Sequence, residues 1–330
     1  MKKNVAIIAG GYSSEFEVSL RSAENLYSYI DKERYNVYRV ILRKDAWKVV
    51  ESFAVPPSKK LEGISIDKNR FLFWKGSSCT YFNFAYITIH GTPGEDGRLQ
   101  GYFDMLGIPY STCGAQTSAL TFNKYVCNHF LKSQGIVVSD SMLVRKGQSV
   151  HVDEIIGKLG LPVFVKPNDG GSSFGVTKVK EASHMQAAIE KAFQEGSEVI
   201  IERFIPGIEL TCGCYQTNHK IVTLPVTEVV PANEFFDYDA KYNGEVQEIT
   251  PARISAGLTE KIQRETEKIY NFIGAKGIIR VDYIVTPDEI PVFLEVNTTP
   301  GMTATSFIPQ QVHVAGLSMK DIMTEIIEKR

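Results

Sequence analysis

Apolar and polar residues alternate along the first third of the chain in blocks that predict strands and helices in turn. Apolar-rich runs at 4–10, 35–42 and 84–91 are typical of buried strands. A helical pattern follows the first run, and Ser14 and Glu17 have the spacing of a capping box at its start. This alternation predicts a doubly wound parallel sheet, in which ligands bind at the carboxyl ends of the strands.

The pattern changes near residue 113, where strands and helices no longer alternate regularly. We predict a helix at about 117–133, strands at 161–167 and 176–180 around a glycine-rich loop, and a helix from 182 to about 195. This order is typical of a small α+β unit with a glycine-rich hairpin.

Strands recur from residue 197 onward and are followed by one long irregular stretch. Strands are predicted at 197–204, 209–216 and 220–230, and helices at about 258–274 and 318–329, with a hairpin at 278–297 between the two helices. The stretch at 231–254 has no clear periodicity. A loop of roughly 20 residues inside a compact domain is often a functional lid.

Polar, mostly charged side chains occupy every second position of the two hairpin strands: Arg280 and Asp282 in the first, Glu295 and Asn297 in the second. Side chains alternate across a strand, so each pair shares one face. If residues 286–291 connect an antiparallel hairpin that pairs Val285 with Val292, Asp282 lies opposite Glu295 and all four polar side chains point the same way. The opposite face carries Val281, Tyr283, Leu294 and Val296, which we expect to pack under helices.

This polar face has two interpretations. Two facing carboxylates repel each other unless a positive charge lies between them. Two carboxylates and an amide oxygen are hard ligands that suit Mg²⁺, usually together with phosphate oxygens and water. A solvated sheet face with ordinary charge alternation gives the same pattern. The hairpin alone leaves both interpretations open, and a phosphate site elsewhere in the chain favours the metal.

The loop "KPNDGGSSFGV" at 166–176 has the composition of such a phosphate site. Its glycines and serines are Gly170, Gly171, Gly175, Ser172 and Ser173. Glycines let backbone N–H groups approach an anion closely, serines add hydroxyl donors, and Lys166 leads into the loop. An ordinary hairpin turn needs far fewer of these residues, and the loop matches neither GxGxxG nor GxxxxGK[ST]. Lys124 is a second candidate phosphate contact, although a lone helix lysine is usually solvated.

Glu15 and His90 follow the carboxyl ends of two predicted strands. Glu15, in the first turn of a helix, either complements the helix dipole or binds a substrate ammonium or hydroxyl group. A histidine at the end of a strand is more often a structural hydrogen-bonding residue than a catalyst. Neither residue decides between its two interpretations by itself.

Composition narrows the class of protein without naming it. A chain of 330 residues predicts about two domains, with three small ones possible. The 36 basic and 38 acidic residues give a net charge of −2, which does not point to nucleic acid or to an anionic membrane. The first apolar run is shorter than a signal-peptide core, and none approaches a membrane span. The five cysteines have no CxxC spacing, so we expect free thiols in a cytoplasmic protein.

Seven motifs together resemble the D-alanine:D-alanine ligase family of the ATP-grasp superfamily. They are "GGYSSEFEVSL", "HGTPGEDGRLQG", "KPNDGGSSFGV", "IIERFIPGIE", "AKY", "RVDY" and "LEVNTTPGMT", in the order typical of that family. The departures are Ser14 where alanine is common, Phe16 where a polar residue is usual, and Thr299 where serine is usual. None of these falls on a position to which we assign chemistry.

The resemblance implies a three-domain ATP-grasp fold of mixed α/β and α+β class. An N-terminal Rossmann-like domain with a doubly wound parallel sheet is expected at 1–112, a small central α+β lid domain at 113–200, and a C-terminal catalytic domain with a mixed sheet at 201–330. ATP would lie between the central and C-terminal domains, and a homodimer is expected.

The resemblance also implies roles for individual residues. Phosphates would be bound by Lys124, Lys166 and the loop residues Gly170, Gly171, Ser172 and Ser173. The adenine would be bound by Glu202, Arg203 and Ile205, and the ribose by Glu209. Two Mg²⁺ or Mn²⁺ ions would be held by Asp282, Glu295 and Asn297, which agrees with the face assignment made from strand parity.

The implied reaction joins two D-alanine molecules in two steps. The carboxylate of the first attacks the γ-phosphate of ATP to give an acyl phosphate, and the amine of the second then displaces phosphate. Arg280 and the Gly301 N–H would stabilise the oxyanion. The first substrate would contact Glu15 and His90, and the second carboxylate would contact Ser306, Phe307 and Lys241. Glu15, Ser172 and Tyr242 would form a hydrogen-bonded set that holds the lid closed.

Other interpretations of the same sequence stay open. The first is another ATP-grasp carboxylate–amine ligase, which includes a D-alanine:D-lactate ligase. Relatives that make the ester, however, typically carry histidine where this chain has Tyr242. A nucleotide-binding regulatory module without turnover is a second, but every charged position needed for metal and phosphate chemistry is present. A nicotinamide dehydrogenase is a third, but "GGYSSE" lacks the third glycine of that fingerprint.

Overall fold

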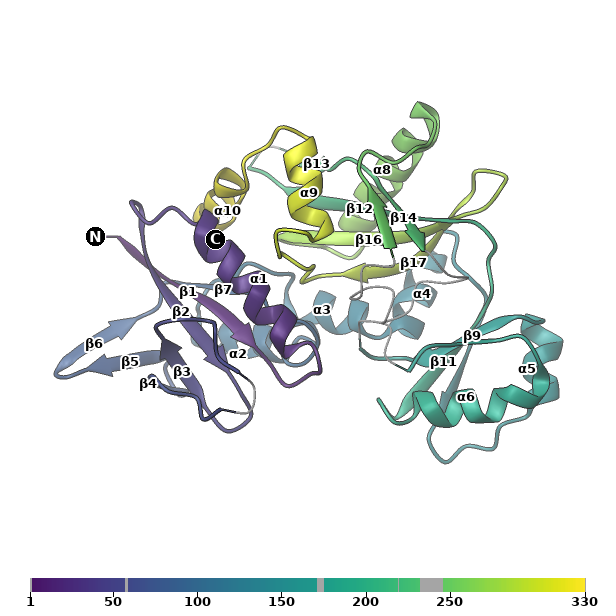
Figure 1. The fold of residues 1–330 in the computed structure, drawn as a ribbon, viewed down its shortest axis with the longest axis horizontal. Coiled ribbons are helices and arrows are strands. Elements are labelled where there is room, and N and C mark those ends of the chain that lie inside the picture. Colours follow the sequence, from purple (N-terminus) through teal and green to yellow (C-terminus); the bar gives the residue numbers. More distant parts are fainter. Residues whose placement is uncertain (1, 57–58, 171–174, 219, 232–245, 330) are drawn as a thin grey trace.

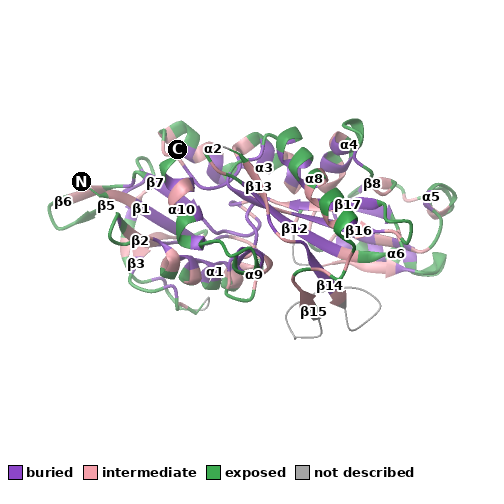
Figure 2. Cartoon of the chain, turned by 90° about the horizontal axis from the view of Figure 1, so that it is seen from above, coloured by how far each residue is buried: buried purple, intermediate pink, exposed green. Residues whose placement is uncertain are grey.

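The computed structural model describes residues 2–56, 59–170, 175–218, 220–231 and 246–329. They form three sheets that follow one another along the chain (Figure 1). Among these residues no helix is both long enough and apolar enough to cross a bilayer. In Figure 2 the strands β1 (Lys3–Gly10) and β12 (Ile208–Gln216) are largely buried, whereas β6 (Ser78–Tyr81), at one end of the molecule, is intermediate to exposed.

The first sheet has the strand order β6-β5-β4-β3-β2-β1-β7. Its strands are β1 (Lys3–Gly10), β2 (Tyr35–Leu42), β3 (Trp47–Val50), β4 (Ile64–Asp67), β5 (Leu72–Lys75), β6 (Ser78–Tyr81) and β7 (Phe84–Ile87). β1 pairs in parallel with β2 and β7, whereas β2 to β6 pair antiparallel. The predicted parallel sheet is therefore confirmed for three strands only. Turns as short as residues 43–46 cannot make the crossover that parallel strands need.

Two helices cover this sheet, α1 (Phe16–Tyr29) and α2 (Arg98–Leu106). The predicted capping box at the start of α1 is wrong. Glu15 holds the N-cap position and makes no side-chain cap hydrogen bond, so Ser14 lies one residue too early to cap the helix. Ser13 Oγ instead accepts a hydrogen bond from the Glu15 N–H at 3.3 Å.

The second sheet has the order β10-β9-β11-β8, and all its neighbours pair antiparallel. Its elements are β8 (Ser141–Arg145), α5 (Val152–Leu159), β9 (Val163–Pro167), β10 (Thr177–Val179), the 3-10 helix η1 (Ala182–His184), α6 (Met185–Ala192) and β11 (Glu198–Arg203). A separate apolar core, drawn entirely from residues 142–201, lies between this sheet and helices α5 and α6. β8 and α5 were not among the elements predicted from the sequence.

The helix predicted at 117–133 is two helices, α3 (Ala115–Phe122) and α4 (Lys124–Ser133). The break falls at Asn123, whose backbone is extended and whose side chain accepts a hydrogen bond from the Val126 N–H at 2.9 Å. Asparagine competes with the helix by capping the next one, which explains the break.

The third sheet has the order β15-β14-β12-β16-β17, with β13 paired to β12, and these strand pairs are antiparallel. One parallel bridge, between Val138 and Phe293, makes the sheet mixed. Its elements are β12 (Ile208–Gln216), β13 (Ile221–Thr223), β14 (Thr227–Pro231), β15 (Val246–Ile249), α8 (Ala256–Phe272), β16 (Ile278–Val285), β17 (Pro291–Asn297), α9 (Phe307–Val314) and α10 (Met319–Glu328).

The hairpin β16–β17 has the predicted register only near its polar residues. Arg280 pairs with Asn297 and Asp282 with Glu295, as predicted. Beyond them the register shifts by one, so that Val285 pairs with Pro291 and the predicted pairing with Val292 is wrong. A β-bulge at this shift changes the side-chain alternation on β17.

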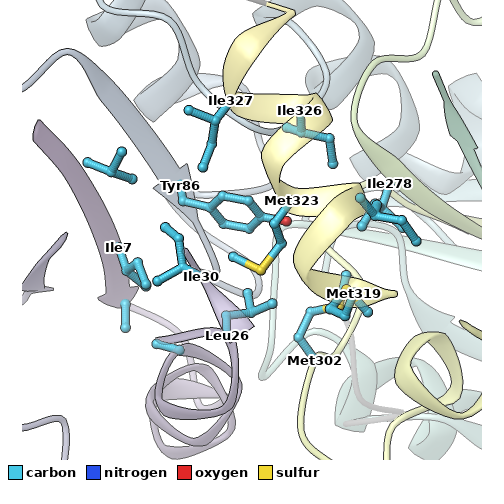
Figure 3. Packing of buried hydrophobic residues seen from close by; sticks show 14 of the residues in the cluster. Ile7, Leu26, Ile30, Tyr86, Ile278, Met302, Met319, Met323, Ile326 and Ile327 are labelled. Atoms are coloured by element: carbon cyan, nitrogen blue, oxygen red, sulfur yellow. The ribbon is translucent and has the colours of Figure 1, made fainter. Parts of the chain in front are cut away.

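A shared apolar core joins the first and third sheets. It contains Ile7 of β1, Leu26 of α1 and Tyr86 of β7 together with Ile278 of β16 and Met323 of α10. Figure 3 shows Met323 lying between Tyr86 and Ile30 on one side and Ile278 on the other. The C-terminal helix therefore packs against the N-terminal sheet, far from its own neighbours in the sequence.

Candidate active site

A cavity of about 950 Å³ opens where the three sheets meet. Its lining includes twelve of the residues predicted to be functional: Glu15, Lys124, Lys166, Gly170, Glu202, Arg203, Ile205, Glu209, Arg280, Asp282, Glu295 and Phe307. They come from segments up to 292 positions apart in the chain, between Glu15 and Phe307. The cavity therefore brings together the predicted nucleotide, metal and acyl groups.

Asp282 lies at the centre of the polar face of the hairpin. Arg280 donates to both of its carboxylate oxygens, with Nε 2.9 Å from Oδ1 and an Nη 2.7 Å from Oδ2. Asn297 Nδ2 donates to Oδ2 at 3.1 Å, and Thr211 Oγ1 on β12 donates to Oδ1 at 2.5 Å. Thr211 is a member of the site that the sequence analysis missed, because its pairing partner on β16 became known only with the sheet register.

The charge of Arg280 is held firmly in this setting. Burial by itself would lower the pKa of Arg280, but the adjacent Asp282 carboxylate, with Glu295 and Glu209 further away, outweighs burial and raises it. The guanidinium also lies over the ring of Phe307, 5.1 Å from its centroid. Arg280 is therefore a fixed cation beside the paired carboxylates, as expected of a group that stabilises a developing negative charge.

Asp282, Glu295 and Asn297 fit the donor set of a divalent cation. Asp282 and Glu295 face each other across the hairpin and both residues line the cavity, whereas Asn297 contacts Asp282 from outside the lining. Within the described ranges no group of three or more His, Cys, Asp or Glu side chains converges on one point. The predicted set has two carboxylates and one amide, and Mg²⁺ completes such a shell with phosphate oxygens and water.

Lys124, at the first position of α4, connects the glycine loop with the hairpin. Its Nζ donates to the Gly170 carbonyl at 2.5 Å and lies 3.8 Å from Glu295 Oε2. The helix break at Asn123 places Lys124 against the start of the glycine-rich loop. Lys124 is therefore held by tertiary contacts, unlike an ordinary solvated helix lysine.

Lys166 and Glu202 form an ion pair on neighbouring strands β9 and β11. The distance from Lys166 Nζ to Glu202 Oε2 is 2.6 Å, and both residues are buried. Asn128 Nδ2 donates to the other oxygen of Glu202 at 3.0 Å. These contacts fix a cation and an acceptor at the end of the cavity where we predict the nucleotide.

Glu15 lines the cavity from the N-terminal side, beside the loop at Gly91. Gly91 has φ of 68°, and a Cβ there would lie 2.9 Å from Ser13 Cβ. A larger residue would be strained and would push against the turn that carries Glu15.

His90, Asn297, Gly301 and Ser306 do not line the cavity. His90 is 5% exposed, and its two ring nitrogens contact Thr299 O at 2.8 Å and Ser22 Oγ at 3.3 Å. Burial lowers the pKa of His90, with Arg280 acting in the same direction against Glu15. The structure therefore places His90 behind the cavity wall.

Gly301 and Ser306 lie next to each other in the turn that leads into α9. A Cβ on Gly301 would lie 2.9 Å from Ser306 Oγ. Ser306 Oγ accepts a hydrogen bond from the Thr303 N–H at 3.0 Å, and its own N–H donates to the Thr303 carbonyl at 3.0 Å. The predicted oxyanion donor and the predicted carboxylate receptor thus share one tight turn.

Five predicted site residues lie outside the described residues: Gly171, Ser172, Ser173, Lys241 and Tyr242. Their roles stay predictions from the resemblance.

Leu294 was predicted to pack under helices, and the structure corrects this. It is half-buried and lines the cavity next to Glu295, because the bulge between the strands changes the alternation on β17. Phe164 and Phe204, whose ring centroids are 6.0 Å apart, also line the cavity and add aromatic surface near Glu202. Phe164 lies outside the seven motifs, and the motifs that contain Leu294 and Phe204 gave these two residues no role in the site.

Comparison with family models gives matches over nearly the whole chain. Residues 4–113 match the model described as D-ala D-ala ligase N-terminus, and residues 130–328 match the one described as D-ala D-ala ligase C-terminus. The chain is 63% identical over 328 residues to a D-alanine–D-alanine ligase from Parabacteroides distasonis, covering 99% of this chain and 97% of the relative. It is 59% identical to one from Bacteroides fragilis, with both chains fully covered.

Solved structures agree in fold. A D-Ala:D-Ser ligase (VanG) from Enterococcus faecalis superposes with a TM-score of 0.86 at 33% identity, covering 99% of each chain. A D-alanine–D-alanine ligase from Bacillus anthracis complexed with ATP gives a TM-score of 0.77 at 29% identity, covering 99% of this chain and 96% of that one. These matches confirm the resemblance and the ATP-grasp fold that it implied. The chain therefore belongs to the D-alanine–D-alanine ligase family.

Proposed function

We propose that this protein joins two D-alanine molecules into D-alanyl-D-alanine while ATP is converted to ADP and phosphate. The observation that carries the proposal is the single cavity in which two lysines, a carboxylate pair and a buried arginine are brought together. The high identity to relatives named D-alanine–D-alanine ligase supports the choice of substrate. The dipeptide is a precursor for peptidoglycan.

In the first step the carboxylate of one D-alanine attacks the γ-phosphate of ATP, which forms an acyl phosphate and releases ADP. Lys124 and Lys166 neutralise phosphate charge, while Glu202, Arg203, Ile205 and Glu209 bind the nucleoside. Glu15 binds the ammonium of this D-alanine. Asp282, Glu295 and Asn297 would hold divalent cations, which would neutralise charge at the transferred phosphoryl group.

In the second step the amine of the other D-alanine attacks the acyl carbonyl, and the C–O bond to phosphate breaks. Arg280 and the Gly301 N–H stabilise the tetrahedral oxyanion. The turn at Ser306 and Phe307 receives the second carboxylate, and Phe307 also packs against the Arg280 guanidinium at 5.1 Å.

The proposal also covers the domain boundaries, the oligomeric state and the cellular location. We assign residues 1–112, 113–200 and 201–330 to N-terminal, central and C-terminal domains. We also propose a homodimer located in the cytoplasm. Size-exclusion chromatography with light scattering tests the dimer, because a mass near that of one 330-residue chain would contradict it.

The reaction is tested by phosphate release with ATP, Mg²⁺ and D-alanine, with the product identified by mass spectrometry. We expect phosphate and dipeptide in equal amounts. Absence of D-alanine-dependent phosphate release would overturn the proposal. An ester formed with added D-lactate, or a mixed dipeptide with D-serine, would assign the chain to a ligase of different specificity.

Asp282→Asn tests the site within that assay. Losing this carboxylate removes one metal ligand and leaves Arg280 without its bidentate partner, so we expect kcat to fall about 10²–10³-fold. Asp104→Asn is the matched control, because Asp104 is exposed on α2 and its side chain accepts a hydrogen bond from Tyr110 Oη at 2.9 Å, which an asparagine oxygen can also accept. Activity of Asp282→Asn within twofold of the unchanged protein would contradict the role.

A further inference from the structure

One backbone residue of the loop after β17 is held on both sides by side chains from the N-terminal region. His90 Nδ1 lies 2.8 Å from the Thr299 carbonyl, and Glu95 Oε1 accepts a hydrogen bond from the Thr299 N–H at 3.3 Å. His90 and Glu95 both come from the segment that follows β7, more than 200 positions earlier in the chain. Neither the motifs nor the function proposed above gives Glu95 a role.

Glu95 is held in place by its own loop as well. Its second oxygen accepts a hydrogen bond from the Gly91 N–H at 2.7 Å. Burial, with a smaller contribution from the charge of Glu15, raises the pKa of Glu95 to about 8. Burying a carboxylate is costly, and backbone N–H donors offset part of that cost.

Two residues of α1 hold the same loop three positions further on. Asn25 Nδ2 donates to the Met302 carbonyl at 2.7 Å, and Ser22 Oγ accepts from the Met302 N–H at 3.1 Å. Ser22 Oγ also lies 3.3 Å from His90 Nε2. One assignment satisfies all these contacts: His90 is neutral, its Nδ1–H donates to Thr299, and its Nε2 accepts from the Ser22 hydroxyl.

The position of this loop affects two groups that the proposed reaction needs. Thr299 lies two residues after Asn297, a predicted metal ligand, and two residues before Gly301, the predicted oxyanion donor. A displacement of the Thr299 peptide would move both groups relative to Arg280. Displacements of about 1 Å in a catalytic group can lower a rate about 10²-fold.

We propose that Glu95 is a positioning residue for the ligase reaction, which holds the Thr299 backbone and thereby sets the Gly301 N–H at the acyl centre. The proposal rests on the ligase function stated above. His90 acts in the same way, through Thr299 and Ser22, since both of its ring nitrogens contact these residues and its side chain lies behind the cavity wall. The N-terminal region thus supplies two side chains with different tasks: Glu15 binds the first D-alanine, and Glu95 holds the backbone of the loop after β17.

The test is Glu95→Gln, which keeps size and shape but places an N–H₂ group against one of two backbone N–H donors. We expect kcat to fall about tenfold or more, with KM for ATP within twofold, because the nucleotide end is built by Lys166 and Glu202. Asp104→Asn is the matched control and should keep both constants. An equal loss of ATP affinity, or an unchanged kcat, would overturn the proposal.

Hydrogen exchange of the peptide spanning 298–303, without substrates, gives a second readout that does not depend on activity. Glu95→Gln should raise its exchange rate severalfold, and Asp104→Asn should not. If the unchanged protein shows no D-alanine-dependent turnover, the ligase function fails, and exchange still decides whether Glu95 holds the loop.

If Glu95→Gln does not fold, Asn25→Ala takes its place, because Asn25 is only half-buried and holds the same loop. It should likewise lower kcat with little change in KM for ATP, and faster exchange at 298–303 should accompany that loss. An Asn25→Ala variant with unchanged kcat and exchange would overturn the proposal.

Discussion

One of the apolar cores contains residues of both the first and the third sheet, whereas the core of the second sheet is drawn from its own region alone. The shared core draws on residues from Val5 to Ile327, with α10 packed between the two sheets. The core of the second sheet contains residues from 142–201 only. Opening the first arrangement would expose buried apolar surface, whereas the second region can move without losing its core.

Polar contacts join the second sheet to the rest of the molecule near the cavity. Asn168, fully buried at the end of β9, accepts a hydrogen bond from the Tyr125 N–H at 2.9 Å and donates to Glu198 Oε2 at 2.8 Å. Its carbonyl accepts from the Lys124 N–H at 3.1 Å. Each such bond contributes only about 0.5–1.5 kcal/mol net, less than a shared apolar core. We therefore expect the second sheet to move relative to the body that the first and third sheets form.

The largest expected effect comes from Met323→Ala in the shared core. Met323 is fully buried, and its truncation should cost about 2–5 kcal/mol of unfolding free energy. If the two sheets form one body, hydrogen exchange will rise in both α1 and α10. Ile189→Ala, in α6 and 1% exposed, is the matched control, and its effect should stay within 141–203. A rise confined to α10 after Met323→Ala would contradict a shared cooperative unit.

A smaller effect is expected from Asn168→Ala at the junction. The variant leaves the Tyr125 N–H without its acceptor and removes one of the hydrogen bonds to Glu198 Oε2, which should cost about 1–3 kcal/mol. The second sheet should unfold at a lower denaturant concentration than the rest, and KM for ATP should rise more than kcat falls. Gln186→Ala is the control, because Gln186 is exposed on α6 and donates to Glu190 one turn away. Equal destabilisation of both regions would argue against a polar junction.

The smallest effect is expected at the rim of the shared core. Glu328 accepts from Lys3 Nζ at 2.8 Å and from Tyr35 Oη at 2.7 Å, and these bonds lower its pKa below the usual value. A carboxyl group whose pKa is lower in the folded than in the unfolded chain stabilises the fold at pH values above its unfolded pKa of about 4.5. This stabilisation is lost as the pH falls through the pKa of the folded state. Because the pair is largely solvent-exposed, Glu328→Gln should cost about 0.5 kcal/mol at pH 7.

The measurement is thermal unfolding of Glu328→Gln from pH 3 to pH 7, with Glu181→Gln, an exposed carboxylate of the second region, as the control. The difference from the unchanged protein should shrink as pH falls toward 3. A difference that stays constant over this range would show that the charge of Glu328 is not its source.

Much of the site could be predicted because its chemistry is local in sequence. The polar alternation of β16 and β17 placed Asp282 opposite Glu295, and the glycine loop indicated a phosphate site near Lys166. Strand parity is independent of the rest of the fold, so the pairing of Asp282 with Glu295 survived an error in the register, while the phosphate site stays a prediction. Leu294 and the capping of α1 were wrong because a one-residue shift, at a bulge or a helix start, has no strong sequence signal.

By itself the sequence determined the family, the order of the sheets and the residue types of the cavity. Short apolar runs, turn glycines and charged motifs act on residues a few positions away, so they can be recognised from the sequence alone. Only the tertiary structure decided that α10 packs on the first sheet, that Asn168 joins the second sheet to α4, and that Glu95 reaches Thr299. Those contacts depend on side chains from distant segments meeting in a common core, and no local pattern encodes the partner.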